Sequence, residues 1–310
     1  MSGSLESLRR KIAGASDLGN VVRSMKALAA SSIGQYEKAV QSLDDYYRTV
    51  ELGLAACIRE GSVSRLDPVT RTAASMIGAV VFGSDQGLVG GFNEALAEFA
   101  SHELGTLPSK TTKIWAVGER IQSLMVDVGP QHVGVLSIPI SVNGITPLVG
   151  QILVEIEAAL EHGVVGEVHV FYNHPKSGAI YEPVNKRLLP LDRPWESGFA
   201  KLPWPTGNLP QVIGSTTSVL RALSREYLFV LLFQACAESL ASENASRLAA
   251  MQRAEKNIRE ILDDLSGTFH RLRQESIDEE LFDLISGYEA MAKRVTKLGV
   301  PPPVLATGDH

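Results

Sequence analysis

The chain has 310 residues, 45% of them hydrophobic, and a formal net charge of −6, which allows a large folded core and argues against general nucleic-acid binding. Its apolar runs are too short to span a bilayer, and we expect no secretory signal because the charged first residues lack an apolar stretch. Two cysteines without CxxC spacing, Cys57 and Cys236, fit a reduced, cytoplasmic protein.

The first predicted element is a long N-terminal helix over residues 4–58. From Ile33 to Cys57 its apolar residues alternate at spacings of three and four, which is the heptad seam of a coiled coil, and a less regular seam extends back to Leu5. A helix of this length spans about 80 Å, more than an ordinary globular domain needs.

The middle of the chain changes to short apolar runs that alternate with helical patterns. Strands are expected over residues 76–83, 113–117, 134–138, 167–173 and 179–189, and helices over 93–100, 118–128 and 148–161. The last two strands flank a turn with Pro175 and Gly178, as in a hairpin. Strands alternating with helices predict a mostly parallel, Rossmann-like α/β domain.

The last element is a second long helix, because no proline falls between Gln211 and Val300. Its seam has regular spacing from Ile258 to Leu272 and resumes at Ile277. We expect the two long helices to pair as an antiparallel coiled coil. The predicted parts are an N-terminal shaft helix (1–60), a central α/β domain (61–210), a C-terminal shaft helix (211–300) and a flexible tail (301–310).

One motif raises the question of a bound ligand. GSDQGLVGGFN, residues 83–93, places four glycines between a strand and a helix, where a phosphate can bind. Its spacing is neither GxGxxG nor that of a Walker loop and it contains no lysine, so we favour a tight structural turn. The histidines have no metal-ligand spacing and the carboxylate clusters read as helix surface. We therefore expect no catalytic residue, cofactor or metal.

Three segments resemble the gamma subunits of F-type ATP synthases. Residues 24–40, SMKALAASSIGQYEKAV, are similar to the family's MKMVAASK region, and residues 82–96 are similar to its SDRGLCGGFN signature. Residues 238–291 resemble its closing pattern, SE.ASRM.AM..A..NA. The resemblance implies a coiled-coil shaft with an α/β foot. It also implies a non-catalytic central-stalk rotor that couples ion translocation to ATP synthesis or hydrolysis.

The resemblance also implies partners. In the family the shaft stands inside a ring of alpha and beta subunits, and the foot lies on the membrane c-ring beside epsilon. Met25 and Lys26 match the stretch that faces an acidic loop of beta, and Arg273 and Gln274 match a pair that contacts a catch loop of the head. The implied location is the cytoplasmic face of the bacterial plasma membrane, with membrane contact only through the complex.

Several positions depart from the family pattern. SDLGNVV, residues 16–22, replaces NTQKIT and includes Gly19, a poor helix former. Asp278 stands at a usual threonine, Val89 at a usual cysteine, and residues 292–310 extend beyond the usual end. These departures suggest a divergent form, such as the alternative, sodium-type ATPase of some bacteria. The sequence leaves proton and sodium transport both open.

Two other functional classes compete with this interpretation. A dinucleotide-binding enzyme requires a glycine fingerprint and an acidic residue after the second strand, and residues 113–117 offer neither. A coiled-coil tether explains the terminal helices but leaves the α/β middle without a role.

Overall fold

The computed structural model describes residues 2–60, 76–107, 111–126, 132–176, 179–191, 198–199, 201–208 and 210–297. The chain divides into two compact units, one of residues 1–24 with 253–310 and one of residues 25–252, which are described separately below. The predicted tail, residues 301–310, lies outside the described residues, and the predicted part boundaries remain predictions.

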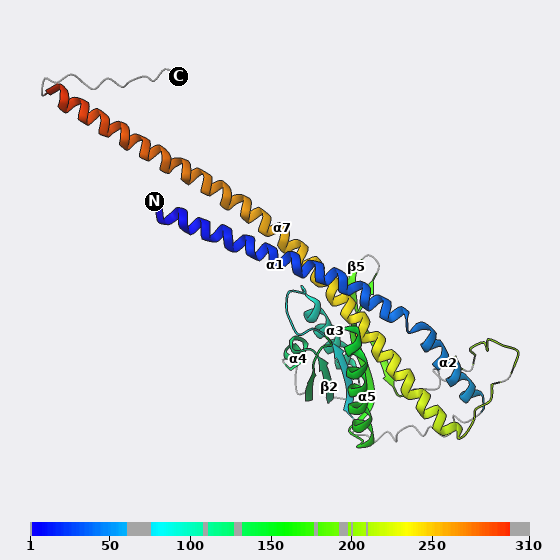
Figure 1. The fold of residues 1–310 in the computed structure, drawn as a ribbon. Helices are drawn as coiled ribbons and strands as arrows, with labels where there is room; N and C mark the ends of the chain where they lie inside the picture. Colours follow the sequence, from blue (N-terminus) through cyan, green and yellow to red (C-terminus); the bar gives the residue numbers. More distant parts are fainter. Residues whose placement is uncertain are drawn as a thin grey trace. The chain divides into compact units, whose positions relative to one another are not determined.

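The larger unit contains a five-stranded sheet in the order β3-β2-β1-β4-β5 (Figure 1). The strands are β1 (Met76–Phe82), β2 (Thr112–Val117), β3 (His132–Leu136), β4 (Val165–Lys176) and β5 (Ala179–Leu189). Strands β1 to β4 pair in parallel and β5 pairs antiparallel with β4, as the hairpin pattern predicted. The predicted Rossmann-like sheet is confirmed.

Alternating residues of the sheet feed two separate cores. Val80, Phe82 and Trp115 pack with α5 (Ile145–Glu161) and part of α7 (Thr216–Lys297). Val81 and Ala116, on the opposite face, pack with α3 (Phe92–Thr106) and α4 (Glu119–Val126). A short 3-10 turn, η2 (Val142–Gly144), precedes α5. Helices on both faces explain why these parallel strands are apolar throughout.

The N-terminal helix is interrupted, so the prediction of one helix over residues 4–58 is wrong. The structure has α1 (Ser2–Gln41) and α2 (Asp44–Arg59). At the break the Ser42 hydroxyl donates to the Ala39 carbonyl (2.9 Å), and the Leu43 amide donates to Val40, three residues back, at 3.0 Å. Serine and aspartate side chains compete for backbone hydrogen bonds, which explains a break at the sequence SLDD.

Helix α7 is one helix of 82 residues, as the absence of proline predicted. In the larger unit it pairs with α2, where Tyr47 stacks on Tyr227 with ring centroids 5.9 Å apart. The hydroxyl of Tyr46 donates to Glu226 at 2.7 Å. A Cβ at Gly53 would lie 3.0 Å from Leu223. Residue numbers rise on one helix as they fall on the other, so the pairing is antiparallel.

The smaller unit repeats this antiparallel pairing between the start of α1 and the later part of α7. The Arg9 guanidinium lies 5.4 Å from the ring centre of Phe269. A Cβ at Gly19 would lie 3.4 Å from Ile258 Cγ2. Ile258 is buried and the next seam residues are half-buried, namely Leu262, Leu265, Phe269 and Leu272. The predicted antiparallel coiled coil is thus present in both units.

Gly19 provides a test of the packing between the helices. We expect Gly19→Ala to raise the free energy of unfolding by about 0.5–1 kcal/mol, because alanine restrains the unfolded chain and its methyl group meets Ile258 at ordinary contact distance. Gly53→Ala should gain less, because its Cβ would lie 3.0 Å from Leu223. Thermal unfolding followed by circular dichroism measures both, and equal shifts would contradict the proposed difference in packing.

Candidate functional site

The glycine-rich motif forms the loop between β1 and α3, at the carboxyl edge of the sheet. A Cβ at Gly83 would lie 2.2 Å from Ile121 Cβ, so no larger residue fits without movement of α4. Gly118, at the end of β2, has φ +114°, and a Cβ there would lie 2.6 Å from the Ser84 carbonyl oxygen. These two glycines let the ends of adjacent strands come close together.

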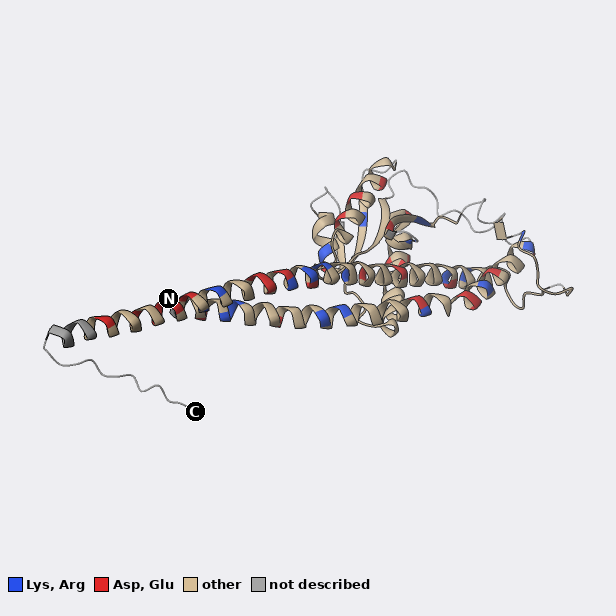
Figure 2. Ribbon diagram, turned by 90° about the horizontal axis from the view of Figure 1, so that it is seen from above, with Lys and Arg blue, Asp and Glu red and all other residues tan. Residues whose placement is uncertain are grey.

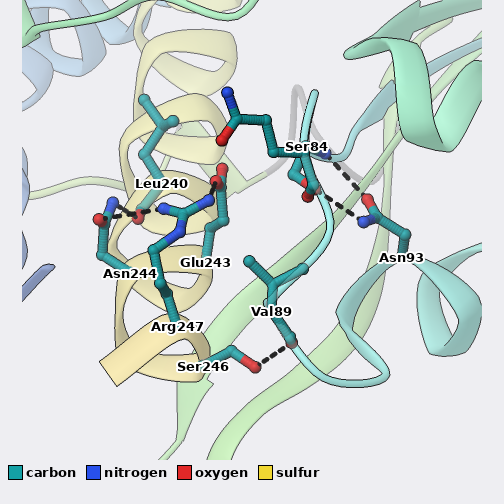
Figure 3. Close-up of polar contacts among 9 residues, drawn as sticks. Ser84, Val89, Asn93, Leu240, Glu243, Asn244, Ser246 and Arg247 are labelled. Carbon is teal, nitrogen blue, oxygen red and sulfur yellow. Dashed lines mark hydrogen bonds and ion pairs between the residues drawn. The ribbon is translucent and has the colours of Figure 1, made fainter. Parts of the chain in front are cut away.

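Ser84 and Asn93 close the loop with reciprocal hydrogen bonds (Figure 3). The Ser84 amide donates to Asn93 Oδ1 at 2.9 Å, and Asn93 Nδ2 donates to the Ser84 hydroxyl at 2.7 Å. The same hydroxyl donates to the Gln86 carbonyl at 2.9 Å. The Ser84 amide is therefore bonded within the loop. This geometry fits the structural turn that the sequence favoured.

Serine hydroxyls of α7 donate hydrogen bonds to this edge of the sheet. Ser239 Oγ donates to the Phe82 carbonyl at the end of β1 at 2.9 Å. Ser246 Oγ donates to the Val89 carbonyl in the loop (Figure 3). The Glu238 carboxylate oxygen Oε2 lies 2.7 Å from Nδ1 of His174, near the end of β4, within hydrogen-bonding distance.

We call the contacts of Ser239, Ser246 and Glu238 with the sheet edge the joint. The joint lies where related sheets bind their ligands. In doubly wound sheets, ligands bind at the carboxyl edge where the strand order reverses. Here that point lies between β1 and β4. Side chains of α7 contact the ends of both strands there, and Asn173 Nδ2, on β4, donates to the Phe92 carbonyl at 3.0 Å. The edge that holds a nucleotide in other folds of this kind is used here to attach a helix.

A buried ion pair lies on α7 beside the joint. Glu243 is 5% exposed and pairs with Arg247, one turn along the helix. Burial raises the pKa of the Glu243 carboxyl above its ordinary value, and the neighbouring Arg247 guanidinium opposes part of that shift. Arg247 Nη1 also donates to Asn244 Oδ1 at 3.4 Å, while Asn244 Nδ2 donates to the Leu240 carbonyl at 2.8 Å (Figure 3).

The residues expected to contact partners lie on the two long helices. Met25 and Lys26 are half-buried neighbours on α1, in the larger unit. Arg273 and Gln274 are exposed neighbours on α7, in the smaller unit. Their contact roles stay predictions.

Beyond Leu272 the buried seam of α7 ends, although apolar residues continue. We call residues 274–291 the tip segment. Its large apolar side chains are exposed by 47% to 73%: Ile277, Leu281, Phe282, Leu284, Ile285, Tyr288 and Met291. The sequence pattern predicted a resumed heptad seam here. In the described part of the chain that seam is not covered, and exposed apolar surface of this kind marks a binding site.

Across the described ranges, no three His, Cys, Asp or Glu side chains gather in a way that could hold a metal ion. A search of the same residues finds no helix with the length and apolarity needed to cross a bilayer.

Comparisons with known proteins agree on one family. The family model described as ATP synthase matches residues 4–291. The ATP synthase gamma chain of Nitrosomonas europaea is 27% identical over 294 residues, covering 92% of this chain and 98% of that relative. The gamma chain of Roseiflexus castenholzii is 27% identical over 298 residues, covering 94% and 99%.

Solved structures show the same fold. A chain of the Euglena gracilis mitochondrial ATP synthase OSCP/F1/c-ring, in rotational state 3, aligns with a TM-score of 0.64 at 16% identity over 100% of both chains. A chain of the rotor of that synthase, in rotational state 1, aligns with a TM-score of 0.60 at 16% identity, covering 89% of this chain and 100% of that one.

Glu243 gives the joint a pH dependence that can be measured. In the unfolded chain the Glu243 carboxyl loses its proton near pH 4.5. In the folded chain it keeps the proton to higher pH, because burial raises the pKa of Glu243. Its contribution to the free energy of unfolding therefore falls as the pH rises from 4.5 through the folded pKa. Glu243→Gln, which cannot titrate, should show a smaller fall over that range.

The matched control is Glu260→Gln, an exposed glutamate on the same helix. Urea unfolding at a series of pH values gives the profiles. Glu260→Gln should keep the wild-type profile, and a Glu243→Gln profile parallel to the wild type would contradict the assignment.

Proposed function

This chain belongs to the ATP synthase family, and we propose that it is the gamma subunit, the rotating central shaft of an F-type ATP synthase. It carries torque between the membrane c-ring and the catalytic head of alpha and beta subunits. The observation that carries this proposal is α7, a single helix of 82 residues. One part of α7 is hydrogen-bonded to the α/β domain, and another part exposes an apolar seam.

The joint at the sheet edge gives the shaft its connection to the foot. Ser239, Ser246 and Glu238 each bond to a different point: the end of β1, the glycine-rich loop and the end of β4. Three separate bonds resist rotation of the domain about the helix better than one bond does. The c-ring turns the foot, where epsilon also binds, and the joint passes that torque to α7.

The head contacts have to be weak because each is broken in every turn. Met25 and Lys26 face the acidic loop of beta, and Arg273 and Gln274 meet a catch loop of the head. Exposed ion pairs contribute only about 0–1 kcal/mol, so they bias a moving contact without locking it. A single asymmetric shaft in a ring of like sites makes unequal contacts, and these drive the sites into different states.

The chain supplies no catalytic residue, and ATP is bound and hydrolysed in the head. The bonded Ser84 amide and the absence of a Walker lysine support this assignment. The chain lies on the cytoplasmic face of the bacterial plasma membrane and reaches the bilayer only through the complex.

Single-molecule rotation tests the proposal. Both native cysteines are buried, so Val154→Cys, at a position on α5 that is 57% exposed, provides a selective site for a bead on the foot. The head, assembled from the chain with alpha and beta, is fixed to a surface and given Mg-ATP. We expect the bead to turn in one direction, whereas the isolated chain hydrolyses no ATP. Hydrolysis by an assembled head with a stationary bead would refute the rotor role.

Two basic residues of α1, Arg23 and Lys26, give a second test. We expect the double variant Arg23→Glu and Lys26→Glu to lower the ratio of ions pumped to ATP hydrolysed, while the amount of assembled complex stays near normal. The reason is that Arg23 is exposed and Lys26 is half-buried, so these charges contribute little to assembly but set the moving contact with an acidic loop. Pumping in membrane vesicles, normalised to hydrolysis, measures coupling. Failed assembly together with normal coupling in the remaining complexes would contradict the contact role.

A further inference from the structure

The contact between His174 and Glu238 joins a histidine that is open to water to a carboxylate that is not. The side chain of His174, near the end of β4, is 41% exposed, whereas that of Glu238, on α7, is 8% exposed. The nearest atoms of the two residues, Nδ1 and Oε2, lie 2.7 Å apart. The histidine can therefore exchange protons with the solvent while it contacts the buried carboxylate.

Glu238 has few partners of its own. Residues 227–237 of α7 carry no charge, so this part of the helix supplies no basic side chain before Glu238 (Figure 2). The side-chain amide of Gln234, one turn earlier, donates to Oε1 at 2.7 Å. Within the described ranges, His174 is the one ion-pair partner of Glu238. Because a charged donor binds a carboxylate more strongly than a neutral one, the protonation of His174 decides how tightly this pair holds.

The charged groups around His174 come from the hairpin and from α1. Glu182 stands opposite His174 on β5 and pairs with Lys176, so those two charges offset each other. Glu37, on α1, lines a small cavity together with Lys176 and adds a carboxylate to this side of the hairpin. Among the described residues, none of these groups replaces His174 as the positive partner of Glu238.

Tyr172 lies between the histidine and the sheet but does not share its role. Its ring packs edge-on against His174 with centroids 6.4 Å apart, and Lys186 Nζ lies 5.4 Å from the centre of the same ring. Burial raises the pKa of the Tyr172 hydroxyl, and the Glu238 carboxylate adds to that rise. Tyr172 therefore keeps its proton at the pH values where histidines titrate.

We propose that His174 and Glu238 form a proton-dependent latch between the β4–β5 hairpin and α7. When His174 is neutral, its Nδ1–H group donates an ordinary hydrogen bond to the carboxylate. When a proton from the solvent binds to the other ring nitrogen, Nε2, the same contact becomes an ion pair with a bond about twice as strong. The latch rests on the described contacts alone, and its effect on torque between foot and shaft rests on the proposed function.

Hydrogen exchange of the full-length chain at about pH 5.5 and about pH 8.5 tests the latch. A histidine in an unfolded chain titrates near pH 6.5. One that gains a negative partner on folding stabilises the fold below that pH, and this contribution is lost as the pH rises. Protection factors, which correct for the direct effect of pH on exchange, are measured for the amides of β4 and β5. Between the two pH values they should fall about threefold more in the wild type than in His174→Gln, which cannot gain a proton.

Two further variants separate the latch from other sources of pH dependence. His102→Gln, on α3, removes a side chain that is 78% exposed and should keep the wild-type fall. Glu238→Gln keeps the size of the side chain but removes its charge, so it should lose the extra fall as His174→Gln does. His169, also on β4, is present in every variant and cancels in these differences. Circular dichroism checks that each variant folds.

A His174→Gln chain whose protection factors fall as much as those of the wild type would overturn the proposal. A folded Glu238→Gln chain that kept the wild-type fall would overturn it too, because the histidine would then respond to another group. The free chain is measured in all cases. Failure of the latch is therefore distinct from failure of the proposed function, which would appear as a chain that does not assemble with alpha and beta subunits.

Discussion

Hydrogen bonds from serine hydroxyls of α7 to carbonyl groups at the sheet edge are the interactions on which the rest of the structure depends. Ser239 reaches the end of β1 and Ser246 reaches the glycine-rich loop. Apolar packing alone is non-directional, so it fixes the rotation of a helix on a sheet less sharply than hydrogen bonds do. Directional bonds to fixed carbonyls set the rotation and register of α7 against the sheet, and hence the direction in which the helix leaves the α/β domain.

The same contacts explain how a nucleotide-binding architecture serves a mechanical part. A parallel sheet presents the ends of its strands along one edge, where loops and helix N-termini are available to a ligand. In this chain Asn93 uses the loop amide of Ser84 internally, and α7 contacts the strand ends. The fold is retained while its usual binding edge becomes an attachment point, so fold alone is a poor guide to chemistry here.

Much of the architecture could be predicted because heptad spacing and strand alternation are local patterns. The five strands, the hairpin and the unbroken α7 all follow from them. The break at Ser42 and Leu43 could not, since the seam continues through it and only a side-chain hydrogen bond reveals the change. The joint was also hidden, because Ser239 and Ser246 look like ordinary small residues until the sheet edge is placed against them. The expected head contacts, such as Lys26 and Arg273, depend on partner chains and remain predictions.

The interruption between α1 and α2 has a consequence for elasticity. Two helices joined along a seam resist twisting through their hydrogen-bonded ladders. At Leu43 the ladder of the N-terminal helix shifts from a four-residue to a three-residue bond, whereas α7 continues as one helix. We expect twist imposed on the larger unit to be greatest near this break, because the helix pair is least regular there. A less regular point of this kind lets the helix pair twist locally while the strands and helices of the α/β domain keep their packing.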